Sequence, residues 1–228
     1  MKIPPTAHQY LTQSSQKGNA MIYVLIALAL LGFLTVTLSR QNNQADGQDL
    51  SDEQAELYAN EIVQYASASR YAVEMMLSSG SEVNDLNFIL PSDANFNTGS
   101  NIHKVFHPQG GGLNYQAELN EDMVDNTGQP PGWYFTNSIN VEWTPTTAND
   151  AIVSALRIKK AICESINKKI TGSKDIPVLD EALGQVFKST ATVDLDTSIC
   201  PGCDGYPMLC VANQGGTFYG FYSIIAGQ

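Results

Sequence analysis

The chain has few basic residues and lacks the residue patterns by which most enzymes are recognised. Lys and Arg together number 12 among 228 residues, against 23 Asp and Glu, and the formal net charge is −11. Because nucleic-acid binding requires a basic surface, this balance argues against nucleic acid as a partner. There is no Ser/His/Asp or Cys/His set, no nucleotide-binding loop and no pair of carboxylates at a recognisable spacing. The sequence therefore predicts neither an enzyme nor a bound cofactor.

Acidic residues are absent before Asp46, and residues 20–38 form an apolar run of 19 residues without a charge. As a helix, this run would extend about 28 Å, close to the hydrocarbon thickness of about 30 Å in a bilayer. Lys2 and Lys17 precede the run, whereas all 23 acidic residues follow it. Short basic segments stay in the cytoplasm, and long domains are translocated largely regardless of charge. We therefore expect one membrane helix, with the N-terminus inside and the bulk of the chain outside.

Two other interpretations of this run remain open. A secretory signal peptide has a shorter apolar region, of about 7–15 residues, and then a cleavage site with small residues, which residues 38–41 do not provide. A plain single-pass anchor explains the run and the charge asymmetry equally well. It assigns no role, however, to the pair Lys17-Gly18 or to the amphipathic helix expected after the span.

Residues 1–17 form a short polar, basic leader that ends at Lys17, and Gly18 leads directly into the apolar run. This arrangement, with a globular region behind it, resembles the class III signal of type IV pilins and type II secretion pseudopilins. The resemblance implies that prepilin peptidase, an enzyme of the bacterial inner membrane, cuts after Gly18, so that the mature chain begins at Asn19. It also implies that the apolar helix packs against those of other pilin-like subunits in a filament.

One position near the implied cut indicates the type of subunit. Members of this family usually carry a Glu four residues after the first mature residue, where it pairs with the N-terminal amine of the neighbouring subunit. This chain has Tyr23 there, and minor pseudopilins at a filament tip can lack the Glu. The resemblance therefore implies a minor subunit in the inner membrane, with its C-terminal domain in the periplasm, or one incorporated in a surface filament.

Changes in composition divide the chain into four segments. We expect a prepilin-type leader at 1–18, a membrane helix at 19–40, a polar hinge at 41–49 and a periplasmic globular domain at 50–228. The hinge assignment depends on a run of Gln, Asn, Asp and Gly residues, which weakens a helix.

The globular domain is expected to begin with an amphipathic helix. Ser51 and Gln54 have the spacing of a capping box, and Gly80 provides a C-terminal stop. Apolar or small residues recur between them at helical spacing: Ala55, Tyr58, Ile62, Tyr65, Ser69, Ala72 or Val73, and Met76.

Residues 81–149 predict a loop-rich β region, because short apolar pieces alternate with Asn, Gly, Ser, Asp and Pro. Candidate strands lie at 86–90, 104–106, 113–118, 133–136 and 139–143, the last two joined by a hairpin turn at 137–138. Two features of this region carry no site in our interpretation. The glycines at 110–112 lack the Lys-Ser/Thr of a phosphate loop, so we expect a mobile turn. His103 and His107 lie on a strand, where they would not share a helical face, so we expect no metal site.

The remainder of the domain is expected to contain a third helix and a C-terminal hairpin. Asn149 and Asp150 can cap a helix with an apolar face that ends at Gly172. Its other face would carry five of the nine positive charges beyond the span, as a solvated face or a docking surface for an acidic neighbour: Arg157, Lys159, Lys160, Lys168 and Lys169. A short helix at 180–188 and strands at 191–195, 208–212 and 217–225 complete the expected elements.

Four cysteines, at positions 163, 200, 203 and 210, would all lie in an oxidising compartment, where an even number favours disulfides. Three pairings are possible, and we prefer Cys203–Cys210 together with Cys163–Cys200. The spacing Cys200-Pro-Gly-Cys203 also occurs in thioredoxin-like redox sites, but such a site needs a following helix, which Pro207 and the hairpin disfavour. A zinc site of four thiolates is equally disfavoured, because only one C-x-x-C is present.

Taken together, the sequence predicts an α+β protein in which a long N-terminal helix, first transmembrane and then amphipathic, packs on a mainly antiparallel sheet. The pilin-like fold would end in a disulfide-closed C-terminal region. The expected function is that of a minor pilin-like or pseudopilin-like structural subunit. The alternative is a stationary, membrane-anchored periplasmic binding or adhesion module that uses the loops at 110–112 and 200–210 for recognition. A periplasmic thiol oxidoreductase is a third possibility.

Overall fold

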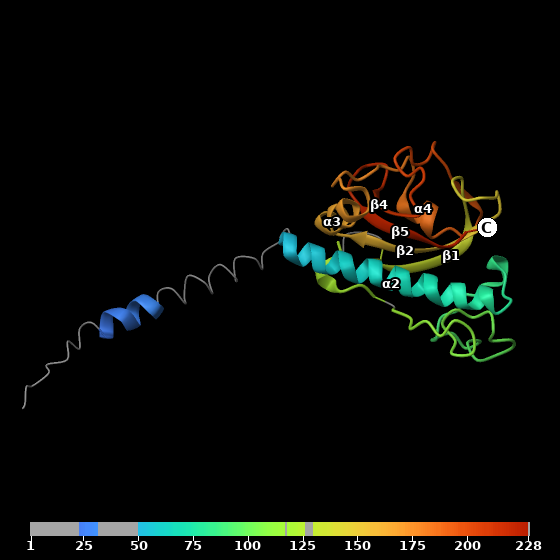
Figure 1. Ribbon diagram of the computed structural model, residues 1–228, viewed down its shortest axis with the longest axis horizontal. Coiled ribbons are helices and arrows are strands. Elements are labelled where there is room, and N and C mark those ends of the chain that lie inside the picture. The colour runs from blue at the N-terminus through green and yellow to red at the C-terminus, as the bar shows by residue number, and fades with distance from the viewer. Residues whose placement is uncertain (1–22, 32–49, 117, 126–129, 228) are drawn as a thin grey trace, which may run out of the picture. The chain divides into compact units, whose positions relative to one another are not determined.

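The computed structural model divides the chain into two units, Met1–Asp49 and Leu50–Gln228. In the first unit, residues 23–31 are helical and their side chains are exposed. All other helices and strands among the described residues belong to the second unit (Figure 1). The residues that the structure describes are 23–31, 50–116, 118–125 and 130–227.

Helix α2 (Asp52–Ser78) opens the second unit, and its start confirms the expected capping box. The Gln54 N–H donates to Ser51 Oγ at 3.2 Å, and the Ser51 N–H donates to Gln54 Oε1 at 3.3 Å. The helix ends at the C-cap Ser79, followed by Gly80 at a φ of +99°. Its buried side follows the expected spacing and consists of Ala55, Ala59, Ile62, Tyr65, Ala66, Ser69, Ala72, Val73 and Met76.

A five-stranded sheet of order β3-β1-β2-β5-β4 forms the centre of this unit. Three of its four strand pairs are antiparallel, and only β1 and β3 run parallel. The α+β class with a mainly antiparallel sheet is therefore confirmed. The strands are β1 (Gly132–Val141), β2 (Asp150–Ile158), β3 (Val193–Leu195), β4 (Met208–Ala212) and β5 (Tyr219–Ala226).

The expected hairpin at 137–138 is wrong, because β1 continues through these residues as one strand. Its pairing with β2 shifts register between Thr136 and Ile139, so residues 137–138 form an irregularity in the strand. The Asn137 side chain donates to the carbonyls of Val83 and Leu86 at 3.3 and 3.2 Å, which holds the irregularity against the preceding loop.

The prediction of strands before β1 is also wrong. Segments 86–90 and 104–106 contribute a single isolated bridge, between Asn87 and Lys104, and residues 113–116 are not in a strand. Turns and two short 3₁₀ helices, η1 (Val83–Asp85) and η2 (Glu121–Met123), occupy much of this region instead.

Residues 150–158 were expected to begin a helix, but they form the central strand β2, and every one of them is buried. A strand covered on both faces does not alternate between apolar and polar residues. Its nearly continuous apolar run therefore also contains apolar residues at helical spacing, which is why a helix was predicted. Helix α3 (Lys160–Thr171) begins after β2, with Lys159 rather than Asn149 or Asp150 at its N-cap. Its C-cap is Gly172 in the left-handed region, as expected.

The two faces of the sheet belong to different hydrophobic cores. Ala151, Val153 and Ala155 of β2 pack in the core with α2 and α3, whereas Ile152 and Leu156 pack in the core with α4 (Leu183–Phe187). Alternate residues of a strand point to opposite faces, so β2 joins both cores. In Figure 1, α2 lies along one side of the sheet and α4 on the other.

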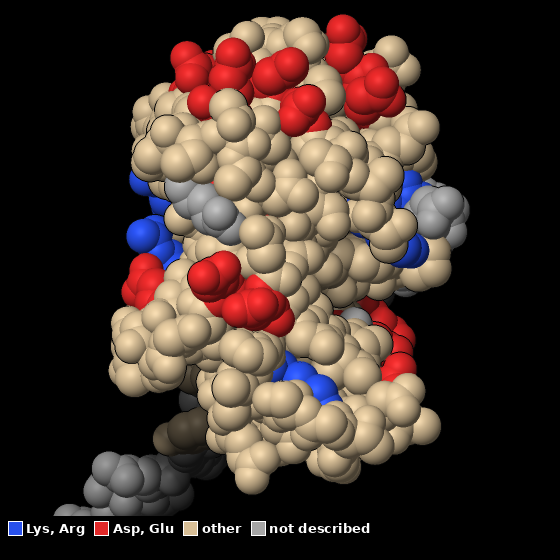
Figure 2. Space-filling view, turned by 90° about the vertical axis from the view of Figure 1, so that its right-hand side faces the viewer, with Lys and Arg blue, Asp and Glu red and all other residues tan. Residues whose placement is uncertain are grey.

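Charges are unevenly placed on the surface of the molecule. Figure 2 shows acidic side chains gathered at the top of the view, while the basic ones lie in small separate groups. No broad basic surface is visible on this face.

Candidate functional site

The sequence-based processing residues, Gly18 and Asn19, lie outside the described residues. The same holds for most of the expected membrane helix, of which only residues 23–31 are described. Within the described parts of the chain, no helix is both long and apolar enough to span a bilayer.

All four cysteines form disulfides, but the expected pairing is wrong. The bonds are Cys163–Cys210 and Cys200–Cys203, with Cα–Cα distances of 5.3 and 5.4 Å. The sheet explains this outcome, because Cys210 and Cys163 belong to the core on the α2 and α3 side, whereas Cys200 and Cys203 belong to the opposite core. A bond between Cys203 and Cys210 would have to cross the sheet.

The Cys200–Cys203 pair does not have the surroundings of a thioredoxin-like redox site. Both cysteines are buried, and the chain after Cys203 runs through turns into β4 rather than into a helix. Asp196 fixes the preceding turn, accepting from the Ser198 hydroxyl at 2.6 Å and the Ile199 N–H at 2.9 Å. These hydrogen bonds, with that of the Ser198 hydroxyl the strongest, lower the pKa of the Asp196 carboxyl.

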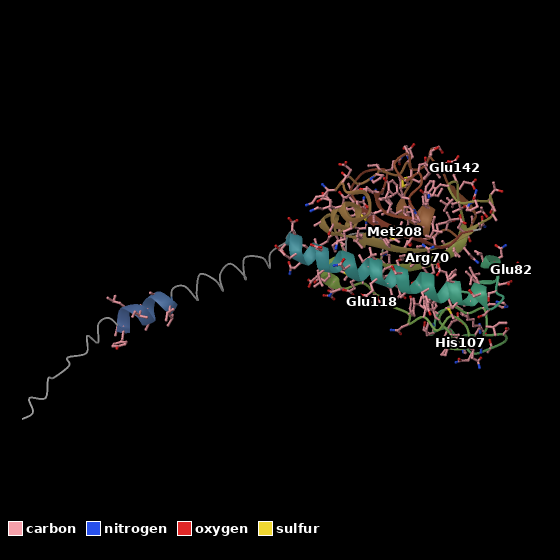
Figure 3. The ribbon with its side chains drawn as sticks, viewed as in Figure 1. Arg70, Glu82, His107, Glu118, Glu142 and Met208 are labelled. Atoms are coloured by element: carbon pink, nitrogen blue, oxygen red, sulfur yellow. A yellow bond between two sulfur atoms is a disulfide. The ribbon has the colours of Figure 1, made fainter. Side chains whose placement is uncertain are left out.

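His103 and His107 do not form a pair. His103 Nδ1 lies 2.9 Å from Ser81 Oγ, whereas His107 Nε2 lies 3.3 Å from Asn97 Oδ1. Figure 3 shows His107 in the loops beside the C-terminal half of α2. Within the described residues, no group of three or more His, Cys, Asp or Glu could hold a metal ion.

The same loops enclose Lys104, which is 4% exposed. Its ammonium donates to the main-chain carbonyls of Asn95, Phe96 and Thr98 at 3.1, 2.8 and 2.7 Å and to Asn101 Oδ1 at 2.8 Å. The neighbouring Gly110 fits tightly, because a Cβ there would lie 2.2 Å from the Lys104 carbonyl oxygen. The glycine-rich segment is thus a packed part of this loop rather than a phosphate cradle.

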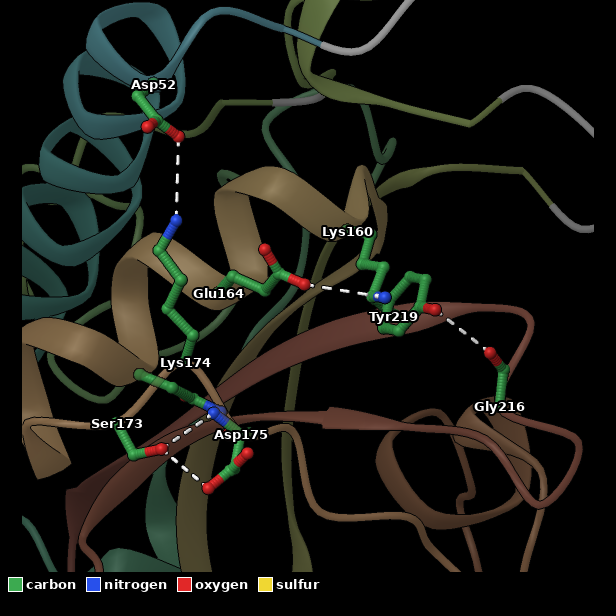
Figure 4. A network of polar contacts seen from close by, with 9 residues as sticks. Asp52, Lys160, Glu164, Ser173, Lys174, Asp175, Gly216 and Tyr219 are labelled. Atoms are coloured by element: carbon green, nitrogen blue, oxygen red, sulfur yellow. Dashed lines mark hydrogen bonds and ion pairs between the residues drawn. The ribbon is translucent and has the colours of Figure 1, made fainter.

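The basic residues expected on one helix are divided between β2 and α3, and several pair with acidic residues. Lys169 Nζ lies 3.0 Å from Glu56 Oε1 on α2, and Lys160 Nζ lies 3.5 Å from Glu164 Oε1. Figure 4 shows the latter pair, together with Lys174 Nζ at 3.6 Å from Asp52 Oδ1. Exposed ion pairs of this kind contribute about 0–1 kcal/mol each.

A cavity of about 570 Å³ on the α4 side of the sheet is the strongest candidate for a binding site. Its volume lies in the range of about 300–1,000 Å³ that is usual for small-molecule sites. Gly220 of β5 makes room beside it, because a Cβ there would lie 2.9 Å from Leu156 Cδ2 and 3.3 Å from Leu183 Cδ2. The cavity is lined by Pro130, Tyr134, Leu156, Arg157, Ala182, Leu183, Gly184, Lys188, Asn213 and Phe218.

Arg157 is the unusual residue of this cavity. It has a φ of 68°, the only positive value at a non-glycine residue in the described chain. The pairing of β2 with β5 steps from Leu156–Gly220 to Ile158–Tyr219, so Arg157 is the extra residue of a β-bulge. Bulges change the direction of a side chain and occur often beside binding sites. Here the bulge places a cation in the wall of a mostly apolar cavity.

The side chain of Arg157 is 6% exposed, and its Cζ lies 3.4 Å from the centre of the Phe218 ring. Its Nε has no hydrogen-bond partner, and no Asp or Glu of the described chain forms an ion pair with it. At the rim, Lys188 Nζ lies 4.7 Å from the centre of the Tyr134 ring. The cavity therefore has two cations, each over an aromatic ring, and only one of them is buried.

Sequence reasoning missed this site, since it placed Arg157 on the basic face of a helix, as a solvated face or a docking surface for an acidic neighbour. One signal was present: Arg157 is the only charged residue in the mostly apolar run 151–158. In comparisons with protein-family models, curated proteins and solved structures, nothing matches this chain.

Proposed function

We propose that this chain is a minor pilin-like or pseudopilin-like structural subunit of a type IV pilus or type II secretion-type filament. The observation that carries the proposal is the pair Lys17-Gly18 directly before the uncharged run at 20–38. An α+β domain in which α2 packs along one side of a mainly antiparallel sheet is compatible with it. In the family that this signal resembles, the helix beyond the membrane lies on a sheet in this way.

The proposed mechanism is mechanical. Prepilin peptidase removes residues 1–18, and the apolar helix that begins at Asn19 stays in the inner membrane. During assembly the helix leaves the bilayer laterally and packs with the helices of neighbouring subunits. Burial of residues 20–38 in lipid is thereby exchanged for burial between helices. The two basic residues of the short segment before the run, Lys2 and Lys17, are consistent with an N-in, C-out orientation.

The test is the intact mass of the protein purified from membranes of a host with and without prepilin peptidase. We expect loss of residues 1–18 only where the peptidase is present, and Gly18→Arg should prevent it. Gly47→Arg is the matched control, because it introduces the same side chain at a glycine outside the signal, and it should leave processing unchanged. Full-length mass in both hosts would contradict the proposal.

Full-length mass in both hosts would favour the alternative, a stationary membrane-anchored periplasmic binding or adhesion module. The observation in its favour is the cavity with the buried Arg157, since a filament subunit needs no such site for assembly. The loops at 110–112 and 200–210 stay candidate recognition surfaces under this alternative.

A further inference from the structure

We propose that the cavity beside α4 binds a monovalent apolar carboxylate, with the carboxylate on Arg157 and the apolar part against the leucines and aromatic rings. Such a group is found in a medium-chain fatty acid and in the C-terminal residue of a peptide. The inference is independent of the proposed function, because the cavity lies wholly within the unit Leu50–Gln228.

The unmatched charge of Arg157 is the first argument. A guanidinium stays charged in a protein interior, and removing a charge from water is costly unless an opposite charge or hydrogen bonds replace the lost hydration. Arg157 is 6% exposed, and its Nε lacks a partner. Stacking on Phe218 orients the guanidinium but provides no hydrogen-bond acceptor. A carboxylate offers two acceptor oxygens in the geometry that a guanidinium fits.

The other lining residues determine the rest of the ligand. Most of the cavity wall is carbon, from Leu156, Leu183, Ala182 and the rings of Tyr134 and Phe218. A sugar or a nucleotide requires many polar partners, and this wall provides few. An alkyl chain or an aromatic ring can instead replace water along the wall and gain hydrophobic free energy.

The net charge of the ligand follows from the same residues. Arg157 is the one buried cation of the cavity, whereas Lys188 is exposed at its rim. A monoanion matches one buried cation. A phosphate monoester carries close to two negative charges at neutral pH, and its second charge would be desolvated without a buried partner.

The conformation of Arg157 is consistent with a binding role. A left-handed φ is unfavourable for a residue with a Cβ, and such residues persist where the surroundings over-determine them, often at binding sites. The bulge at Arg157 is held by the pairings on either side of it and by its own carbonyl, which accepts from the Asp125 N–H at 2.8 Å. The backbone is therefore fixed at Arg157, and stacking on Phe218 holds the side chain in the cavity wall.

Binding can be measured on the full chain by isothermal titration calorimetry with two pairs of probes. The first pair is N-acetylphenylalanine and N-acetylphenylalaninamide, and the second is octanoate and octanamide. Within each pair a neutral amide of similar size replaces the carboxylate, with one acceptor oxygen exchanged for an NH₂ donor, and we expect the acid to bind about 10- to 100-fold more tightly, as for one charge-assisted contact. Binding of only one of the two acids would identify the source of the ligand, peptide or lipid, and would support the proposal in either case.

Two variants locate the site. Arg157→Gln should reduce affinity for the acid to that for the amide, with Lys159→Gln as the control for loss of a nearby charge. Gly184→Leu should abolish binding of both probes by filling the cavity, because a Cβ at Gly184 would meet no atom within 4 Å. Gln185→Leu is its matched control on the same helix, since Gln185 is exposed and does not line the cavity. Gly184→Leu keeps the test valid if Arg157→Gln fails to fold.

Three kinds of result would overturn the proposal. The first is no detectable binding of either acid to the wild-type chain at millimolar concentration. The second is equal affinity for acid and amide, or tighter binding of phenyl phosphate than of N-acetylphenylalanine. The third is unchanged affinity in a folded Gly184→Leu variant, which would place any bound probe elsewhere.

Discussion

Asn167 of α3 is expected to be one of the most important polar residues for stability, because it covers the open edge of the sheet. It is completely buried, and its Nδ2 donates to the carbonyls of Cys210 and Asp175, both at 2.8 Å. Its Oδ1 accepts from the Cys210 N–H, also at 2.8 Å. Cys210 lies in β4, the last strand of the sheet, so the amide of Asn167 replaces a neighbouring strand at this point.

We expect Asn167→Leu to lower the free energy of unfolding by about 4 kcal/mol. The substitution preserves the approximate volume but leaves the buried N–H and carbonyl of Cys210 without partners, each at a cost of about 1–3 kcal/mol, and also removes the partly buried hydrogen bond to the Asp175 carbonyl. For a chain of this size the midpoint of thermal unfolding should fall by about 10 °C. Urea unfolding of the full chain, followed by tryptophan fluorescence, measures the change directly.

Asn60→Leu on α2 is the matched control, because it removes an exposed amide that accepts one hydrogen bond, from Lys169 Nζ at 2.6 Å. We expect it to change stability by less than about 1 kcal/mol. A loss below about 1 kcal/mol for Asn167→Leu as well would refute the reasoning, since water or rearrangement would then have satisfied the strand edge.

A charged side chain at position 167 provides a further test of the role of Asn167. In Asn167→Asp, a carboxylate oxygen would face the carbonyls of Cys210 and Asp175, which raises the pKa of that carboxyl in the folded state. The variant should therefore be least stable at neutral pH. Its stability relative to the wild type should recover as the pH falls towards the unfolded value of about 3.9. A pH-independent difference would contradict this account.

Three further predictions concern other polar residues. Asp150→Ala should lower stability by about 2–4 kcal/mol, and Asp150→Asn by less, in urea unfolding, because the buried carboxylate accepts from the Val141 N–H at 2.9 Å. Lys104→Met should speed hydrogen exchange across residues 93–101 and cost about 3 kcal/mol, since the ammonium has four acceptors there. Because folding lowers the pKa of Asp196 below its ordinary value of 3.8, the turn before Cys200 should be fully stable above that pH and weaken below it. Hydrogen exchange as a function of pH measures this, and Asp196→Asn should remove the dependence.

Local chemistry was sufficient to predict the elements whose ends depend on neighbouring residues. The start of α2 follows from Ser51 and Gln54, three positions apart, and the end of α3 follows from Gly172 in the left-handed region. Strands β4 and β5 follow from two apolar runs around the turn at Asn213, whose Oδ1 accepts from the Phe218 N–H at 2.8 Å. Each of these features is complete within a few residues.

The errors arose where the decisive partner is distant in sequence. The run at 150–158 is compatible with a helix or with a strand buried on both faces, and only its position between β1 and β5 determines the outcome. The prediction of the disulfide pairing depends on the same assignment of residues 150–158. Once 150–158 is a strand, α3 starts at Lys160 and places Cys163 on the same side of the sheet as Cys210.

The interpretation of Arg157 depended on the same secondary-structure assignment. As part of a helix beginning at Asp150 it would lie with Lys160 on a basic face, which was interpreted as solvated or as a docking surface. As the extra residue of a bulge at the end of β2 it turns inward over Phe218. A buried, unpaired cation in a left-handed conformation conflicts with local preference and with polar satisfaction, and such conflicts are expected at functional sites rather than in the supporting structure. The assignment of residues 150–158 to a helix therefore led to the wrong disulfide pairing. It also concealed Arg157, the residue with the clearest indication of ligand binding.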